Sequence, residues 1–287
     1  MEQGLRAAQT GIPEQNLIWS RFSSDKPDVA QGTMRAFRML AFAHNYEKPI
    51  NILSLGCGAE PQLRLLNAAN HNMITLLDND PDALANINER ISRQFYHNIH
   101  TVLENYEAFL DVNYTRAFLK TQLNNQKADA IFLHHSLYYI PMRQWTALIT
   151  NIYNELLAEK GIIHCVLMAR YSDDPHTTTW LYNNYTRRFF NHINDQGLLA
   201  FKETLMEENC LKDAELSDHS SEVKFWVNNF ECFMQVIWMI LLYPQVHDYK
   251  KDQMEIIIND IYNNFFEPKQ PLLQTQDHLY IQKLPPL

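Results

Sequence analysis

Glycine, cysteine and long apolar runs are all scarce in this chain of 287 residues. It has only 7 glycines and 4 widely spaced cysteines without a C-x-x-C pair. That cysteine spacing indicates neither a zinc site nor a disulfide framework, and it favours a reducing compartment. The most apolar run, from Cys232 to Tyr243, includes Gln235 and is shorter than the roughly 20 residues of a membrane-spanning helix. The first residues also have no apolar stretch typical of a secretory signal, so we expect a cytoplasmic protein without membrane contacts.

Basic residues are outnumbered. Lys and Arg total 24 against 33 Asp and Glu, which gives a formal net charge of −9. No basic face that could neutralise phosphates is evident, so we expect no nucleic-acid partner. Hydrophobic residues make up 46% and charged residues 20% of the chain, a composition that predicts a folded domain with a substantial core.

Short apolar runs alternate with helical patterns through the middle of the chain. Helices are expected after Pro61, from Pro81, and over about 142–159, where Gly161 would stop the last one. Continuous apolar strands that alternate with helices predict a parallel sheet with helices on both faces. The expected strands of this part are 50–55, 73–77, 99–103, 130–133 and 162–168.

No linker rich in Ser, Gly or Pro divides the chain, so we predict one α/β domain with additions. Its centre, residues 49–200, would be a Rossmann-like core, and residues 1–48 an N-terminal helical lid. Residues 201–287 would complete a seven-stranded, mostly parallel sheet with its last two strands.

The last part of the chain has a different pattern from the core. Strands are expected at 201–205 and 279–283. Between them, apolar residues at helical spacing predict two helices, at 223–242 and 253–266. These helices would form an insertion over about 222–267, between the last two strands.

Two of the few glycines, Gly56 and Gly58, follow the first expected strand. A strand, Gly-x-Gly and a helix let backbone approach an adenosine-containing ligand in an open α/β sheet. Asp78 ends the second strand, where its carboxylate can accept hydrogen bonds from ribose hydroxyls. Pro61 replaces the third glycine of the dinucleotide fingerprint, and Glu60 lies where a pyrophosphate would bind. Together the glycines and Asp78 favour a nucleotide-type site over the alternative of a tight turn and a surface Asp. Pro61 and Glu60 favour a nucleoside cofactor without phosphate over a dinucleotide.

These motifs resemble those of the class I S-adenosylmethionine-dependent methyltransferases. The resemblance extends from about Ile50 to Met168, and the chain departs from the family pattern with Ser54 in place of an acid and Glu60 in place of a third glycine. The matching segments are 53–59, 77–81, 128–140 and 157–161.

Within that superfamily the sequence is most similar to the histamine N-methyltransferase-like group. The shared features are a serine before Gly-x-Gly, the tripeptide Leu137-Tyr138-Tyr139, an aromatic followed by Tyr-x-x-Arg-Phe over 182–189, and the late helical insertion. S-adenosylmethionine is the cofactor that this resemblance implies.

The resemblance also implies roles for individual residues. His135 would touch the methyl acceptor, at a position where those relatives have Gln, and His135 and Tyr139 are the candidate catalytic residues. The acceptor side would comprise His135, Tyr138, Tyr139, Trp180 and Tyr182. The cofactor side would comprise Gly56, Cys57, Gly58, Asp78, Asn79, Glu104, Asn105 and His134.

The expected reaction is methyl transfer to a small-molecule acceptor, an amine nitrogen in first place. The donor is already activated, so the protein mainly aligns the reactants. His135 would take up the amine proton, and aromatic faces would attract a cationic amine. Two alternatives stay open: a protein side chain as acceptor, and a catalytically silent relative that binds a partner protein. We expect no metal, since the adjacent His134 and His135 would point to opposite sides of an extended chain.

Overall fold

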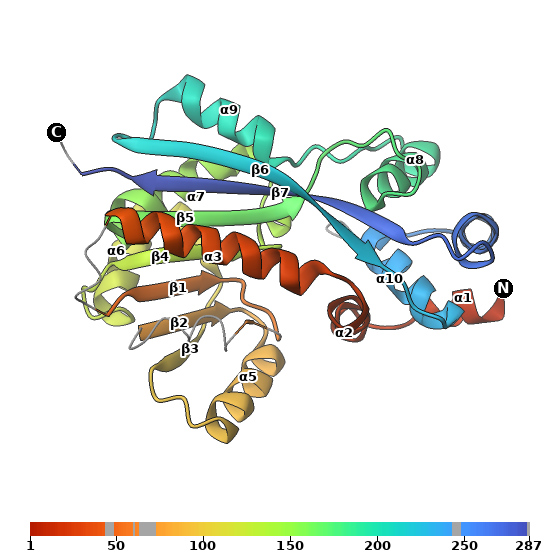
Figure 1. Cartoon of the computed structure of the whole chain (residues 1–287), viewed down its shortest axis with the longest axis horizontal. Helices are drawn as coiled ribbons and strands as arrows, with labels where there is room; N and C mark the ends of the chain where they lie inside the picture. The colour runs from red at the N-terminus through yellow and green to blue at the C-terminus, as the bar shows by residue number, and fades with distance from the viewer. Residues whose placement is uncertain (44–48, 60, 63–72, 243–247, 286–287) are drawn as a thin grey trace. The chain divides into compact units, whose positions relative to one another are not determined.

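The computed structural model describes residues 1–43, 49–59, 61–62, 73–242 and 248–285. Seven strands form one sheet: β1 (Asn51–Leu55), β2 (Met73–Asp78), β3 (Ile99–Leu103), β4 (Ala128–His134), β5 (Leu157–Met168), β6 (Ala214–Phe225) and β7 (Leu272–Lys283). Their order is β3-β2-β1-β4-β5-β7-β6 (Figure 1), and the pairings among β1 to β5 are parallel. The predicted seven-stranded, mostly parallel α/β sheet is confirmed.

Helices precede, connect and follow the strands. The α-helices are α1 (Glu2–Ala7), α2 (Ile12–Phe22), α3 (Asp25–Ala43), α5 (Pro81–Arg93), α6 (Val112–Thr121), α7 (Trp145–Asn151), α8 (Thr178–Phe190), α9 (Leu198–Glu208), α10 (Phe230–Leu242) and α11 (Lys251–Ile261). Short 3₁₀ turns occur at η1 (Tyr106–Leu110), η2 (Leu137–Tyr139) and η3 (Met142–Gln144), and π turns at η4 (Ile152–Leu156) and η5 (Tyr262–Phe266). None of the helices in the described ranges combines the length and the apolar composition that a membrane crossing requires.

Local sequence accounts for several boundaries. Helix α5 begins where predicted: the Asp80 carboxylate accepts hydrogen bonds from the backbone N–H groups of Asp82 and Ala83, and Pro81 occupies the first turn. Helices α10 and α11 lie between β6 and β7, as expected for the late insertion. The helix predicted just after Pro61 lies outside the described residues.

Two predictions in the last part of the chain were wrong. Residues 201–205 belong to helix α9, because the buried Phe201 and Leu205 lie four positions apart on one helical face. The helix predicted from residue 223 begins only at Phe230, since Val223 and Phe225 are buried on either side of the exposed Lys224. That period of two belongs to a strand, and β6 includes these residues.

The prediction that a helix runs to residue 159 was also wrong. The helical segment ends at Leu156, and Leu157 already begins β5. Gly161 therefore lies inside a strand, at an irregular point where Lys160 has a φ of 65° and the β4–β5 register shifts. The glycine relieves crowding there, because a Cβ at this position would lie 2.8 Å from the Ala158 carbonyl oxygen.

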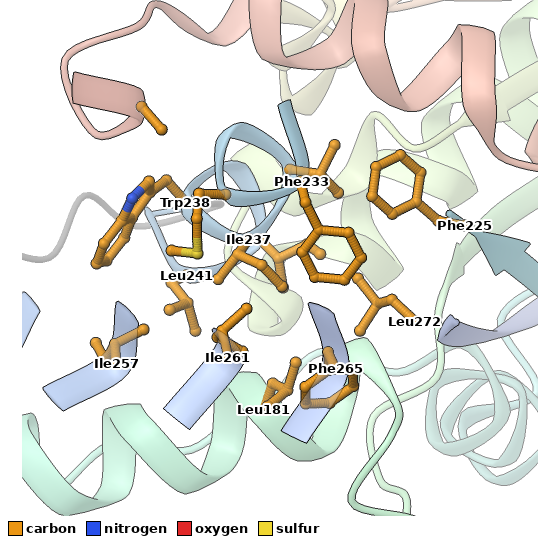
Figure 2. Close-up of a cluster of buried hydrophobic side chains, with 14 of the residues drawn as sticks. Leu181, Phe225, Phe233, Ile237, Trp238, Leu241, Ile257, Ile261, Phe265 and Leu272 are labelled. Carbon is orange, nitrogen blue, oxygen red and sulfur yellow. The ribbon is translucent and has the colours of Figure 1, made fainter. Parts of the chain in front are cut away.

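The chain divides into two compact units, each with its own core. The helical unit comprises Met1–Asp28, Met168–Gly197 and Ser220–Gln276. Its core is a cluster of apolar and aromatic side chains, many of them from α10 and α11 (Figure 2). The sheet unit comprises Val29–Leu167, Leu198–His219 and Asp277–Leu287.

Both faces of the sheet unit are covered. On one face, Phe37 of α3 packs edge-on against Phe132 of β4, with ring centroids 5.8 Å apart, and α5 contributes Leu84 and Ile87 to the same cluster. The alternate residues of the strands, such as Leu133, are fully buried as well. At the carboxyl ends of the parallel strands β2 and β4 the last residue is polar, Asp78 on β2 and His134 on β4.

Candidate active site

The glycine turn after β1 is held against the end of β2. The N–H groups of Gly56 and Cys57 donate to the Leu77 carbonyl at 2.9 and 3.1 Å. Both glycines have left-handed backbone, with φ of 65° at Gly56 and 60° at Gly58. Its chain neighbours aside, a Cβ on Gly58 would meet no atom of the described residues within 4 Å, so none of them fills the space beside this part of the backbone.

Asp78 connects this turn to the next loop. Its side chain is buried, and its two carboxylate oxygens accept hydrogen bonds from the N–H of Gly58 at 2.7 Å and the N–H of Asp80 at 3.0 Å. A carboxylate has about four lone-pair sites, so both oxygens can still accept from ribose hydroxyls. The structure thus brings Gly58 and Asp78, twenty residues apart, into direct contact.

The loop after β3 adjoins the same acid. The N–H of Glu104 donates to the Asp78 carbonyl at 2.9 Å. The Glu104 carboxylate accepts from the N–H of Asn105 at 2.9 Å and from the Tyr114 hydroxyl, and this hydrogen bond raises the pKa of Tyr114 to about 12. The Asn105 side chain caps η1 by accepting from Glu107, and Asn79 is exposed. The structure therefore places these predicted cofactor-side residues on two adjacent loops.

Cys57 lies inside the glycine turn. Burial raises the pKa of its thiol, and the negative charge of Asp78 acts in the same direction. A thiol with a raised pKa stays protonated at neutral pH and is a poor nucleophile. Its chemistry thus fits a small side chain that fills the turn.

Two histidines follow one another at the carboxyl end of β4. His134 is the last strand residue, and His135 has a φ of 53°, an uncommon left-handed conformation for a residue with a side chain. The His135 ring stacks on Tyr138, with centroids 6.2 Å apart and an interplanar angle of 16°. Tyr138 is buried, whereas Tyr139 is 59% exposed.

Ser136 is a residue that the sequence reasoning missed. Its carbonyl accepts the Tyr106 hydroxyl at 2.6 Å, and its side chain crowds Gly56, where an added Cβ would lie 2.6 Å from that of Ser136. The Ser136 hydroxyl is buried and has no hydrogen-bond partner among the described residues. A buried hydroxyl without a partner costs stability, which a polar ligand in the turn would recover. Its only signal in the sequence is its position directly after the histidine pair.

The remaining predicted acceptor-side residues belong to the helical unit. Trp180 and Tyr182 lie on α8, and Tyr182 is only 2% exposed. Burial raises the pKa of Tyr182 to about 12. The other predicted site residues all lie in the sheet unit. Within the described ranges, no three His, Cys, Asp or Glu side chains are grouped so that they could hold a metal ion.

The residues present fit a nucleoside cofactor. Among the described residues, none fills the space beside Gly58, Asp78 offers carboxylate oxygens next to it, and none pairs with the Ser136 hydroxyl beside Gly56. An adenosine derivative has the ribose hydroxyls and the polar tail to use all three. A Rossmann-like sheet with this arrangement is typical of the class I S-adenosylmethionine-dependent methyltransferases.

Comparison with known families agrees with that class. A family model described as "Methyltransferase domain" matches residues 29–215, which is more than half of the chain. The chain belongs to this family and is an S-adenosylmethionine-dependent enzyme. No curated protein matches it in sequence.

Solved structures share the fold at low sequence identity. The YcgJ protein from Bacillus subtilis is 11% identical with a TM-score of 0.53, and the match covers 87% of this chain and all of that one. The plantazolicin methyltransferase BamL, solved in complex with a triazolic desmethylPZN analog and SAH, is 13% identical with a TM-score of 0.50, and the match covers 98% of this chain and 97% of that one. At such identities the likeness shows the fold alone.

Proposed function

We propose that this methyltransferase acts on a small molecule and methylates an amine nitrogen. The observation that carries the proposal is the arrangement after β4. There an imidazole in a left-handed turn stacks on the buried Tyr138, and Tyr139 presents an exposed ring two residues after η2 begins. A base beside aromatic faces suits an acceptor that is a cation in water and must lose a proton to react.

The cofactor supplies a methyl group already activated on a sulfonium. The protein therefore has to bind the cofactor and the acceptor, orient them, and remove the proton of the amine. Gly56, Cys57 and Gly58 would hold it through backbone groups, and Asp78 through its ribose. Asn79, Glu104 and Asn105 would lie near its adenine, and His134 beside it. The Ser136 hydroxyl is a further candidate contact, since it is buried next to the glycine turn.

On the acceptor side, His135 would accept the amine proton, and Tyr138 would hold the imidazole in place by stacking. Tyr139 would attract a cationic amine by a cation–π contact of about 0.5–2 kcal/mol. Trp180 and Tyr182 belong to the helical unit, where Tyr182 is a core residue, so the proposed acceptor contacts rest on His135, Tyr138 and Tyr139.

The similarity to the histamine N-methyltransferase-like group supports a nitrogen acceptor and stays a proposal. A protein side chain is the second candidate acceptor. Family membership favours an enzyme over a silent relative. Turnover of S-adenosylmethionine with a panel of amines, phenols and short peptides, followed as S-adenosylhomocysteine release, separates these acceptors. Turnover with peptides and with none of the amines would refute the small-molecule proposal.

Replacement of His135 tests the base directly. We expect His135→Ala to lower turnover about 100-fold or more, since a positioned general base typically contributes that much, while calorimetry shows nearly unchanged cofactor affinity. His135→Gln is the matched control, because Gln stands at this position in the similar group and can still orient an amine. Equal losses of affinity and turnover in His135→Ala would place His135 on the cofactor side instead.

A further inference from the structure

Four adjacent strands of the sheet unit each contribute one histidine. They are His134 on β4, His164 on β5, His278 on β7 and His219 on β6. Nε2 of His134 lies 3.0 Å from Nδ1 of His164, and Nε2 of His164 lies 3.1 Å from Nδ1 of His278. We call His134, His164 and His278 the histidine row. The ring of His219 stacks on the end of the row, with its centroid 4.3 Å from that of His278.

The middle of the row is sealed from water by α3. His164 and His278 are fully buried. A Cβ on Gly32 of α3 would lie 2.6 Å from Nδ1 of His278 and 2.8 Å from Cε1 of His164, so only glycine lets the helix backbone approach this closely. Tyr280 stacks on His164 at 4.5 Å and donates its hydroxyl to the Gly32 carbonyl at 3.3 Å. This packing holds the two buried rings in one orientation.

His164, at the centre of the row, is held in its neutral form. Burial lowers the pKa of His164 well below its usual value, and His134, His278, His219 and Arg35 all act in the same direction. Tyr280, which is also packed against His164, is uncharged in this range. In a neutral histidine one ring nitrogen donates and the other accepts. Because each Nε2 meets the next Nδ1, the tautomer of one ring dictates that of its neighbour.

The N–H groups of the row can donate in either of two directions, and both are compatible with these contacts. In one, every Nε2 carries the proton and donates along the row, which leaves Nδ1 of His134 as an acceptor. In the other, every Nδ1 carries it. The first sense uses in all three rings the tautomer that histidine favours in water.

We propose that His164 and His278 are positioning residues that hold His134 as the neutral Nε2–H tautomer, so that its Nδ1 accepts a hydrogen bond from S-adenosylmethionine. This inference rests on the proposed position of His134 on the cofactor side. S-adenosylmethionine has positive charge at its sulfonium and ammonium groups. An imidazolium would repel these charges and could not accept a hydrogen bond, whereas a neutral ring with a defined tautomer can. Cofactor affinity is therefore expected to fall when acid protonates His134, whereas burial opposes the protonation of His164.

Nitrogen-15 NMR of the imidazoles tests the tautomer on the chain alone, without catalysis. We expect protonated Nε2 and unprotonated Nδ1 in His134, His164 and His278 at neutral pH. A protonated Nδ1 in His134 overturns the inference whether or not the cofactor binds. Conversely, if S-adenosylhomocysteine does not bind the wild-type chain, the proposed cofactor site fails while the tautomer result still stands.

Two replacements of His164 separate positioning from mere packing. In His164→Asn the amide oxygen can take the place of Nδ1 and still accept from His134, whereas His164→Leu removes every partner atom. We expect calorimetry to show cofactor binding weakened about fivefold to tenfold in the Leu variant and by less than about twofold in the Asn variant. Equal weakening in both would show that the row is only structural and would overturn the proposal.

Controls keep the test falsifiable if the Leu variant does not fold. His278→Leu retains the contact of His134 with His164 but removes the partner of Nε2 of His164. The tautomer of His164 is then no longer fixed, and NMR should show mixed tautomers in His134. A single unchanged tautomer there would contradict the relay. His219→Phe retains the ring stack on His278, so it should leave both tautomers and affinity unchanged. In the wild type, affinity should fall at least about fivefold from about pH 7.5 to about pH 5.5, and His134→Leu should abolish that dependence.

Discussion

The core of the helical unit and the carboxyl edge of the sheet unit differ in what they bury: apolar side chains in the first, polar groups in the second. The first is a cluster of apolar side chains in which even Trp238 has its ring N–H satisfied, by the Gly4 carbonyl at 2.8 Å (Figure 2). The second gathers buried polar groups, among them Asp78 and Ser136, and left-handed backbone at Gly56, Gly58 and His135. Burial of apolar surface stabilises the first region. Polar burial and backbone strain cost stability in the second, and such costs typically occur at functional sites.

We expect substitutions in the apolar core of the helical unit to lower the free energy of unfolding the most. Phe233 is fully buried, so Phe233→Ala should lower the free energy of unfolding by about 3–5 kcal/mol, because it loses burial and leaves a cavity. Chemical denaturation measures this loss. Phe42→Ala is the matched control: Phe42 is 95% exposed, and its removal should change stability by less than about 0.5 kcal/mol. Similar losses in both variants would contradict the contrast.

At the edge of the sheet the main effect should be on binding. Asp78→Ala removes the acceptor proposed for the ribose, and we expect cofactor binding to weaken by about 1–3 kcal/mol, the scale of a charge-assisted hydrogen bond. Calorimetric titration with S-adenosylhomocysteine measures it. Asp78→Asn retains one oxygen acceptor for the Gly58 N–H and should lose less. Unchanged affinity in Asp78→Ala would remove Asp78 from the ribose role.

Replacement of the two glycines of the turn by alanine should have the smallest effect, and the effect is on stability. Gly58→Ala adds a Cβ in open space, so only the left-handed backbone opposes it, at a cost of about 1 kcal/mol. Gly56→Ala should cost more, because its Cβ would collide with Ser136. Thermal unfolding measures both costs. If Gly58→Ala were the more destabilising of the two, the space beside Gly58 would not be open.

Much of the fold was predictable because it follows from local patterns. Continuous apolar runs predicted β1, β2 and β4, and Asp80 with Pro81 predicted the beginning of α5. Errors arose where a short segment fits both periods. In residues 201–205 the two apolar side chains, Phe201 and Leu205, lie on one face of a strand and on one face of a helix, and tertiary packing made the segment helical.

The site was predictable only in part, for a similar reason. The glycine turn and Asp78 stand at strand ends, where the topology of a parallel sheet brings them together. Ser136 has no such pattern, and its importance depends on its contact with Gly56. The histidine row cannot be seen in the sequence, since its members come from strands distant along the chain and meet only because β5 lies between β4 and β7.

By itself the sequence determined the class of sheet, the glycine turn, the acid at the end of β2 and the family, because each depends on residues close together in the chain. Only the tertiary structure decided the sealing of His164 and His278 beneath Gly32, the crowding of Gly56 by Ser136, and the division into two cores. The physical reason is that hydrogen bonds and close packing act over a few ångströms. The order of strands in the sheet, rather than the order of residues in the chain, sets which side chains come within that range.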